Sequence, residues 1–424
     1  MAAAPEVNGD GPTAITQPPL RTTARTASDS ELGNHLLETR GLHWIHAANG
    51  DPYAVVLRAQ LDDPCPEYAR VRTRGPLSFS PTGSWVTADH ALAAQALGSP
   101  DLGLSTADGR PVPQQVLAYG EGSPLELGPD ARARLSQESA RTFAPEALER
   151  HRATVDRVHQ DVLRTRVPGP ATGQDFELMG DFVRPAVTAA TAAVLGVPEE
   201  LRQEFATCAE RLRLLPDSLL APQSLWKVRS ALDGLAELDA LSAALPDPAP
   251  GTGARPLRAQ SCALGVTAAA HLAGNAVLAL LDDRSQWRQV CETPELAAHA
   301  VEETLRHDPP VQLDARTVLR ETELAGRRLR AGTHVVVLTA AAGRDPSVFA
   351  DPDRFDLGRQ NAAAHLALHE SGHHGAVAPL VRLQAQAALR ALATRFPGLR
   401  QAGPVLRARR TPVSRGPLSV RMTT

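Results

Sequence analysis

The sequence predicts a mainly α-helical protein with small β-sheets. Two stretches carry clear helix signals: an alanine-rich run from Phe182 to Leu195 stops at Gly196-Val197-Pro198, and a second run starts near Pro294 and stops at Asp308-Pro309-Pro310. Strand-forming residues gather only in a few short segments. A chain of 424 residues is long enough to bury one large core, so we expect these helices to share a single body.

The remaining elements follow in order along the chain. Residues 1–29 are rich in Ala, Pro and Thr without helical periodicity and predict a disordered arm, whereas residues 30–424 are expected to form one domain. Residues 246–253 are rich in Pro, Gly and Ala and predict a linker. Strands are expected where apolar residues alternate or cluster: residues 71–79, residues 84–88 and, as a pair that turns at Gly332, residues 329–340.

Charge and composition exclude several classes of partner. The net charge is −3, and basic residues form a run only at 407–410, so no nucleic-acid partner is expected. No apolar run approaches the ~20 residues that cross a bilayer, and the first thirty residues lack an export signal, so no membrane contact is expected. Four cysteines without metal-binding spacing indicate reduced thiols in the cytoplasm: Cys65, Cys208, Cys262 and Cys291.

The most specific motif lies between Ala341 and Leu392. This stretch contains H-L-A-L-H-E-S-G-H-H-G-A-V-A-P-L and resembles the C-terminal third of bacterial cytochrome P450 monooxygenases. In that family a loop of pattern F-G-x-G-x-H-x-C-x-G supplies the thiolate ligand of the haem iron. Counting back from Ala378-Pro379-Leu380, the cysteine position falls on Gly375. The resemblance therefore implies a cytochrome P450-like fold that lacks the haem thiolate ligand and holds no cofactor.

Two other haem-dependent motifs of that family are altered as well. The family's oxygen-activating helix carries A-G-x-[DE]-T, and here Thr267 takes the place of the acid and Ala268 that of the threonine. Without both groups the proton relay to bound oxygen is absent. The H-x-x-x-R motif that holds a haem propionate falls on Arg132 and Ser136, while Arg316 matches the family's other propionate-binding arginine. The resemblance thus implies a protein without catalytic residues.

A motif that stabilises the fold is retained. Glu303 and Arg306 form the family's E-x-x-R on the helix that starts near Pro294, and residues three apart share a helix face. In the family both contact a downstream arginine, here Arg354 or Arg359. An isolated E-x-x-R is usually a surface pair, but its distance from Arg344-Asp345-Pro346 favours the buried network. These residues are therefore interpreted as structural.

A competing motif indicates zinc. Residues 369–373 read H-E-S-G-H, which matches the zinc-protease pattern H-E-x-x-H with His369 and His373 as ligands. The two rings meet only on a helix, and Ser371-Gly372 disfavours one because glycine costs about 1 kcal/mol at an interior helical position. The family resemblance instead assigns His373 to the former cysteine loop. No metal site is therefore predicted.

The N-terminal part points to function. Residues 40–53 read R-G-L-H-W-I-H-A-A-N-G-D-P-Y and resemble a segment of the haem-free auxiliary proteins that accompany deoxysugar glycosyltransferases in macrolide and anthracycline pathways. Residues 407–416 resemble the C-terminal end of the same proteins. The residues singled out as partner-binding candidates are His43, Trp44, Asn49, Asp51 and Tyr53, although large aromatics such as Trp44 and Tyr53 are more often packed in a core.

The resemblance implies a non-catalytic activator of a TDP-deoxysugar glycosyltransferase in glycosylated polyketide antibiotic biosynthesis. The cognate transferase is the expected partner, in a heterotetramer of two copies of each chain. Two alternatives stay open: a divergent haem monooxygenase with a ligand such as His373 or His374, and a zinc hydrolase at His369 and His373.

Overall fold

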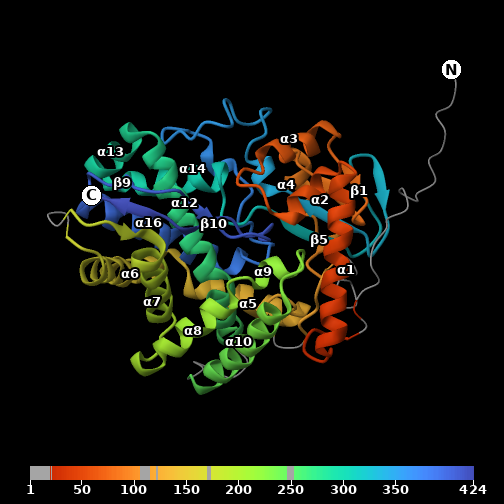
Figure 1. Cartoon of the computed structure of the whole chain (residues 1–424), viewed down its shortest axis with the longest axis horizontal. Coiled ribbons are helices and arrows are strands. Elements are labelled where there is room, and N and C mark those ends of the chain that lie inside the picture. The colour runs from red at the N-terminus through yellow and green to blue at the C-terminus, as the bar shows by residue number, and fades with distance from the viewer. Residues whose placement is uncertain (1–19, 21, 106–114, 121–122, 170–172, 246–252) are drawn as a thin grey trace.

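The computed structural model of the protein describes residues 20, 22–105, 115–120, 123–169, 173–245 and 253–424 (Figure 1). Its α-helices span Asp29–Ala48 (α1), Pro52–Arg58 (α2), Cys65–Thr73 (α3), His90–Gly98 (α4), Pro129–Thr142 (α5), Pro145–Arg166 (α6), Arg184–Val194 (α7), Arg202–Leu212 (α8), Leu215–Ser218 (α9), Leu225–Ala244 (α10), Ala254–Gln260 (α11), Val266–Asp282 (α12), Arg284–Glu292 (α13), Ala297–His307 (α14), Thr339–Ala342 (α15) and Ala378–Arg395 (α16).

The strands are short. They span Ser78–Ser80 (β1), Ser84–Thr87 (β2), Leu102–Gly103 (β3), Phe176–Glu177 (β4), Asp314–Val318 (β5), Thr322–Leu324 (β6), Arg327–Leu329 (β7), His334–Val337 (β8), Arg400–Gln401 (β9), Leu406–Arg407 (β10), Pro417–Ser419 (β11) and Arg421–Thr423 (β12). The largest sheet has the order β1-β2-β8-β5-β3, with β2 and β8 parallel and the other pairs antiparallel.

Helices α12 and α16 form the centre of the body (Figure 1). Helix α12 also packs against α14 and α7. Its inward side chains are small or branched, and Ala273, Ala276 and Val277 are fully buried. Small residues let helix axes approach closely, which explains how a chain with few aromatic residues fills its core.

The molecule has two sides in Figure 1. Helices α1 to α4 lie beside the five-stranded sheet on one side, and α6, α7 and α13 lie on the other. Helix α1 also packs against α10. The fold class predicted from the sequence, mainly α with small β-sheets, is confirmed.

The predicted elements compare with the observed ones as follows. The helix expected at 182–195 is α7, preceded by a π-helical turn at Leu178–Val183, and the helix expected from Pro294 is α14. The strand expected at 84–88 is β2. The expectation at 71–79 was wrong in its first half, because residues 65–73 form α3 and bury Tyr68 and Val71 at helical spacing. The strand pair at 329–340 was also wrong: β7 pairs with β6, whereas β8 pairs with β2 and β5.

The N-terminal segment is tied to the body earlier than expected. Most of the predicted arm lies outside the described residues, but Ala24 is fully buried and its N–H donates to the carbonyl of Ala118 at 2.7 Å. Ser28 caps α1 and forms a capping box with Glu31. The part of the predicted linker up to residue 252 lies outside the described residues.

One helical stretch meets the length and composition of a membrane span. It covers Ala254–Asp282 in the described part of the chain, so the expectation that no apolar run approaches the length of a span was wrong, and 72% of its most apolar window is buried inside the protein. A core helix passes the same test, and most of this stretch is α12 at the centre of the body (Figure 1). Its apolar character is therefore explained by packing.

Candidate functional site

In the loop at the family's cysteine position, the backbone of Gly375 lies directly against the backbone of Glu370. Residues 369–374 form turns rather than a helix, and a short 3₁₀ turn covers Gly375–Val377. A Cβ atom on Gly375 would overlap the carbonyl oxygen of Glu370 and lie 2.7 Å from its Cα. Real Cβ atoms do not approach a backbone this closely, so any side chain at position 375 requires the loop to move.

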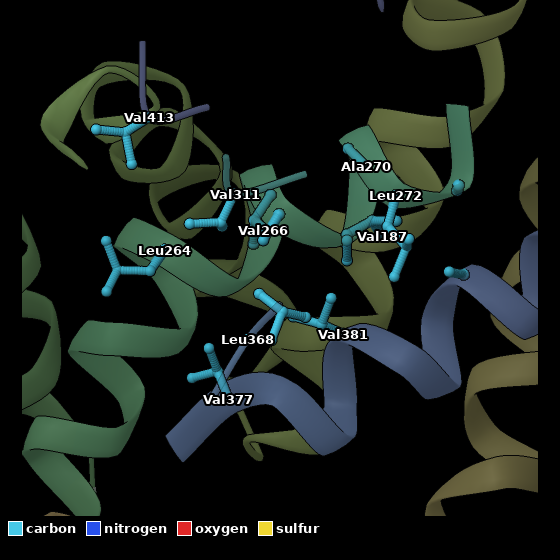
Figure 2. Packing of buried hydrophobic residues seen from close by; sticks show 14 of the residues in the cluster. Val187, Leu264, Val266, Ala270, Leu272, Val311, Leu368, Val377, Val381 and Val413 are labelled. Atoms are coloured by element: carbon cyan, nitrogen blue, oxygen red, sulfur yellow. The ribbon is translucent and has the colours of Figure 1, made fainter. Parts of the chain in front are cut away.

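The space between this loop and helix α12 is filled by side chains. In the family that the sequence resembles, haem lies between the cysteine loop and the oxygen-activating helix, since iron binds the thiolate on one face and oxygen on the other. Here Val377 Cβ lies 3.5 Å from the point where a Cβ of Gly265 would stand. Figure 2 shows Leu368 and Val377 facing Leu264 and Val266 across this space. The distance is an ordinary van der Waals contact, so at this point no planar group fits between the loop and the helix.

The two oxygen-activation positions, Thr267 and Ala268, lie in different surroundings. Ala268 is buried in the core. Thr267 lines a cavity of about 70 Å³ together with His271 and Arg213. His373 lines a different cavity, of about 40 Å³. The Ala268 methyl cannot exchange a proton, and Thr267 opens on a cavity that His373 does not line.

The retained arginine of the propionate site already has an anionic partner. The Arg316 guanidinium is buried, pairs with the Asp314 carboxylate and donates to Ser371 Oγ at 3.0 Å. Arg132 donates to the carbonyl of Leu127 at 3.0 Å, and Ser136 is exposed. Burial lowers the pKa of Arg132, and the charge of Arg316 lowers it further. With Asp314 in place, a haem propionate would meet a carboxylate of like charge, so haem does not fit these residues.

The histidines offered as alternative iron ligands lie in a small cavity. His373 and His374 are both on its lining, and its volume of about 40 Å³ holds about three water molecules at ~10–15 Å³ each. Burial lowers the pKa of His374 to about 4 and that of His373 well below its usual value, so both rings are neutral near pH 7. The cavity does not fit a macrocycle.

The zinc pattern is not arranged as a zinc site. The pattern needs a helix, and residues 369–373 form turns, so His369 and His373 do not share a helix face. The Nδ1 atom of His369 instead lies 2.9 Å from Ser371 Oγ. Within the ranges that the structure describes, no group of three or more His, Cys, Asp or Glu side chains could hold a metal ion.

The E-x-x-R network is complete and buried. Arg306 donates from Nε and Nη2 to the two carboxylate oxygens of Glu303 at 2.8 Å each. Arg359 donates to the same carboxylate at 3.0 Å, so Arg359 is the third member that the sequence left open. Arg354 contributes only its backbone carbonyl, which accepts from Arg306 at 2.9 Å. Glu303 and Arg306 are 1% and 0% exposed, so a lost partner would leave a buried charge.

Three of the five partner-binding candidates are internal. Tyr53 is 2% exposed. Asp51 is buried, accepts from Ala54 N–H at 2.9 Å as the cap of α2, and pairs with Arg74 at 2.8 Å. His43 is buried, and burial lowers its pKa to about 4. The structure therefore places these three side chains mainly inside the protein.

Trp44 and Asn49 remain accessible. Trp44 is 49% exposed, and the Arg58 guanidinium lies 3.6 Å over the centroid of its ring. Asn49 is exposed at the C-cap of α1. Of the residues singled out in the N-terminal segment, these two can reach a partner.

The N-terminal and C-terminal motifs meet in space, which spacing along the chain could not reveal. The N–H of Arg410 donates to the carbonyl of Ala59 at 3.1 Å, and Gln223 Nε2 donates to the carbonyl of Arg410 at 2.7 Å. Together the motifs line one groove, here called the junction groove, formed by Arg40, His43, Trp44, Leu57, Arg58, Gln60, Ala221, Pro222 and Arg410.

The C-terminal motif also fills the interior. Val413 lines the same cavity as His373. The carbonyl of Val413 accepts from Gln312 N–H at 2.8 Å, and the Asp217 carboxylate accepts from the N–H groups of Val413 and Ser414 at 2.8 and 2.9 Å. This segment therefore takes up volume between the cysteine loop and the helices that cover it.

Comparison with known proteins identifies the family to which this chain belongs. The cytochrome P450 family profile matches residues 280–376. The crystal structure of ligand-free CYP164A2 of Mycobacterium smegmatis has a TM-score of 0.73, with 26% identity over 88% of this chain and 99% of that one. EryCII of Saccharopolyspora erythraea, a cytochrome P450 family protein, is 37% identical over 92% of this chain and 97% of its own length. The chain belongs to the cytochrome P450 family.

A more similar relative indicates which group within the cytochrome P450 family this chain resembles. DesVIII of Streptomyces venezuelae is 65% identical over 407 residues, which cover 96% of this chain and 97% of DesVIII. Within the cytochrome P450 family, this chain therefore groups with the P450-like auxiliary proteins of antibiotic biosynthesis that its terminal motifs resemble.

Proposed function

We propose that this protein is a non-catalytic activator that binds and stabilises a TDP-deoxysugar glycosyltransferase in the biosynthesis of a glycosylated polyketide antibiotic. The proposed complex is a heterotetramer of two copies of each chain in the cytoplasm. It contains no haem, nucleic acid or membrane contact, and this chain contributes no catalytic residue to it.

The contact between the Gly375 loop and α12, at the place where the family holds haem, is the observation that supports this proposal most directly. The family fold is retained, including the buried Glu303, Arg306 and Arg359 network. The space for haem is filled where Val377 meets Gly265, and Gly375 cannot carry a side chain. A protein that retains the family fold but has no space for the cofactor can still act by binding a partner at its surface.

Binding alone is a sufficient mechanism for activation. A partner that binds only the folded, active conformation of the transferase shifts its population toward that conformation. The stabilisation follows mass action and amounts to about 2.7 kcal/mol when the free partner is present at 100 times its Kd. A rigid body with small side chains in its core suits this role, since docking orders few of its own residues.

Co-expression tests the proposal. A candidate deoxysugar glycosyltransferase from the same organism is produced alone and together with this protein, and soluble yield, gel-filtration profile and transfer from a TDP-deoxysugar are measured. We expect the two chains to co-elute, a higher soluble yield and faster transfer, while this protein alone turns over no nucleotide sugar. Equal yield and equal rate with and without this protein would overturn the proposal, as would a stoichiometric haem in the purified chain.

A further inference from the structure

One face of helix α1 is apolar and uncovered. Leu37, Trp44 and Ile45 are 60%, 49% and 54% exposed and lie at spacings of seven and eight residues, which places them on one side of the helix. The opposite side packs Leu32 and Leu36 into the core. Single exposed apolar residues are ordinary, but a line of three large ones on one helix indicates a contact surface.

The junction groove beside this face carries positive charge without a matching carboxylate. Arg40, Arg58 and Arg410 line it, and none of the three forms an ion pair in the part of the chain that the structure describes. The Nε atoms of Arg40 and Arg58 are buried there without a hydrogen-bond partner. Burial lowers the pKa of Arg40, and the nearby charge of Arg410 lowers it further. An added anion would relieve both effects.

The backbone at the groove is held in a costly conformation. Ala59 and Arg410 have φ angles of 43° and 64°, in the left-handed region, and a hydrogen bond of 3.1 Å joins them. Residues other than glycine lose about 1–2 kcal/mol there. Such conformations persist where surrounding contacts enforce them and are concentrated at functional positions. Because Ala59 follows Arg58 in the chain, this hydrogen bond holds Arg410 near Arg58 on the lining of the junction groove.

We infer that the glycosyltransferase docks on the exposed face of α1 and the junction groove, and that it inserts a carboxylate side chain among Arg40, Arg58 and Arg410. Trp44, held by Arg58 at 3.6 Å, packs against apolar residues that flank this carboxylate. The inference rests on the proposed function and adds to it the surface and the chemistry of the partner. Aromatic and arginine side chains are the residues that most often dominate binding energy at interfaces.

Gly41 offers a test that does not depend on removing a contact. It lies between Leu37 and Trp44 on the exposed face, and a Cβ atom there meets nothing within 4 Å. Gly41→Trp adds bulk to the docking face without disturbing the core, and it removes a glycine from the helix interior, which favours the helix. Gly41→Ala is the matched control, since it gives the same helical benefit with little bulk. We expect Gly41→Trp to weaken binding to the transferase by about tenfold or more and Gly41→Ala to leave it unchanged.

Charge reversal tests the carboxylate. Arg58→Glu and Arg410→Glu are expected to weaken binding by about tenfold or more, and the wild-type complex to weaken as salt rises. Arg164→Glu, at an exposed position of α6 on the opposite side of the molecule (Figure 1), is the control and should bind normally. If a reversal variant unfolds, Arg58→Gln and Arg40→Gln remove the charge while they keep a polar side chain of similar shape.

The outcomes separate this inference from the proposed function. If wild-type protein binds the transferase and Gly41→Trp, Arg58→Glu and Arg410→Glu bind equally well, the docking surface is wrong and the proposed function stands. If the two reversals bind normally but Gly41→Trp does not, the surface is right and the carboxylate is wrong. If the wild-type protein does not bind the transferase at all, the proposed function fails first.

Discussion

Gly375 lies against the backbone of Glu370, and this contact decides what position 375 can hold. A Cβ atom at Gly375 would stand 2.7 Å from the Cα of Glu370 and overlap its carbonyl. The N–H of Gly375 donates to the carbonyl of Gly372 at 3.2 Å, which keeps the turn tight. The backbone around Gly375 therefore leaves no room for a cysteine side chain, and placing that residue here alone does not create the site.

Gly375→Cys should destabilise the protein and bring no haem. Forcing a side chain into a packed loop costs about 1–3 kcal/mol, and Val377 still fills the space beside Gly265. Urea unfolding and absorption spectra of protein from haem-supplemented cells measure both effects. Gly98→Cys, at a glycine with nothing within 4 Å, is the control and should unfold like the wild type. A Soret band that appears in Gly375→Cys would contradict the conclusion that the haem position is filled.

Glu303→Ala should lower the free energy of unfolding by about 3–5 kcal/mol, because it leaves Arg306 and Arg359 buried without their carboxylate. Soluble yield should fall with it. Glu149→Ala is the matched control, since Glu149 is 70% exposed and pairs with Arg152 at the surface of α6. Equal losses in the two variants would mean that burial of the Glu303 network does not set its cost.

Chelation should leave the protein unchanged. Because His369 and His373 do not share a helix face, we expect the melting temperature with and without EDTA to agree and metal analysis to find no stoichiometric zinc. The double variant His369→Ala, His373→Ala should remain folded and keep its effect on the transferase. A folded double variant that lost this effect together with bound zinc would reopen the zinc hypothesis.

Asp217 should make stability depend on pH. Burial raises the pKa of its carboxyl to about 7 from 3.8, although hydrogen bonds from Ser414 and Val413 oppose the shift. Between these two values the folded state holds the proton and the unfolded chain does not, so this group's contribution to stability falls as the pH rises, by up to about 1.4 kcal/mol per pH unit. Above pH 7 the contribution is constant.

Asp217→Asn isolates this effect. The asparagine Oδ1 can still accept the N–H groups of Val413 and Ser414, so the variant should match the wild type near pH 4 and become the more stable of the two toward pH 7. Urea unfolding at both pH values gives the difference. The exposed substitution Asp161→Asn serves as the reference, and a wild-type-to-variant difference that stays constant with pH would show that Asp217 does not titrate as stated.

The sequence predicted the elements whose signals are local. The helix at 182–195 has a stop signal in Gly196 and Pro198, and the E-x-x-R pair is a pattern within one helix turn. The sequence did not distinguish Arg354 from Arg359, because which of them meets Glu303 depends on the path of the loop between them. The first part of residues 71–79 was misassigned because so short a segment holds too few apolar residues to distinguish a helix from a strand.

The candidate site was only partly predictable for the same reason. Trp44, Asp51 and Tyr53 occur in one motif, yet Asp51 and Tyr53 turn inward at the start of α2 while Trp44 faces outward from α1. A motif that identifies a family does not say which of its residues are exposed. Arg58 and Arg410 lie at opposite ends of the sequence, and only the folded chain brings them to one groove.

A hydrogen bond at the junction groove joins residues 349 positions apart: Arg409 donates to the carbonyl of Gln60, which lines the groove. Contacts between such distant segments carry the largest loop-closure entropy and form late in folding. Partly folded chains, which expose apolar surface and aggregate, therefore lack this groove. The arginines of the groove come together only in the fully folded chain. A partner that recognises the groove therefore binds folded copies of the chain and leaves partly folded copies unbound.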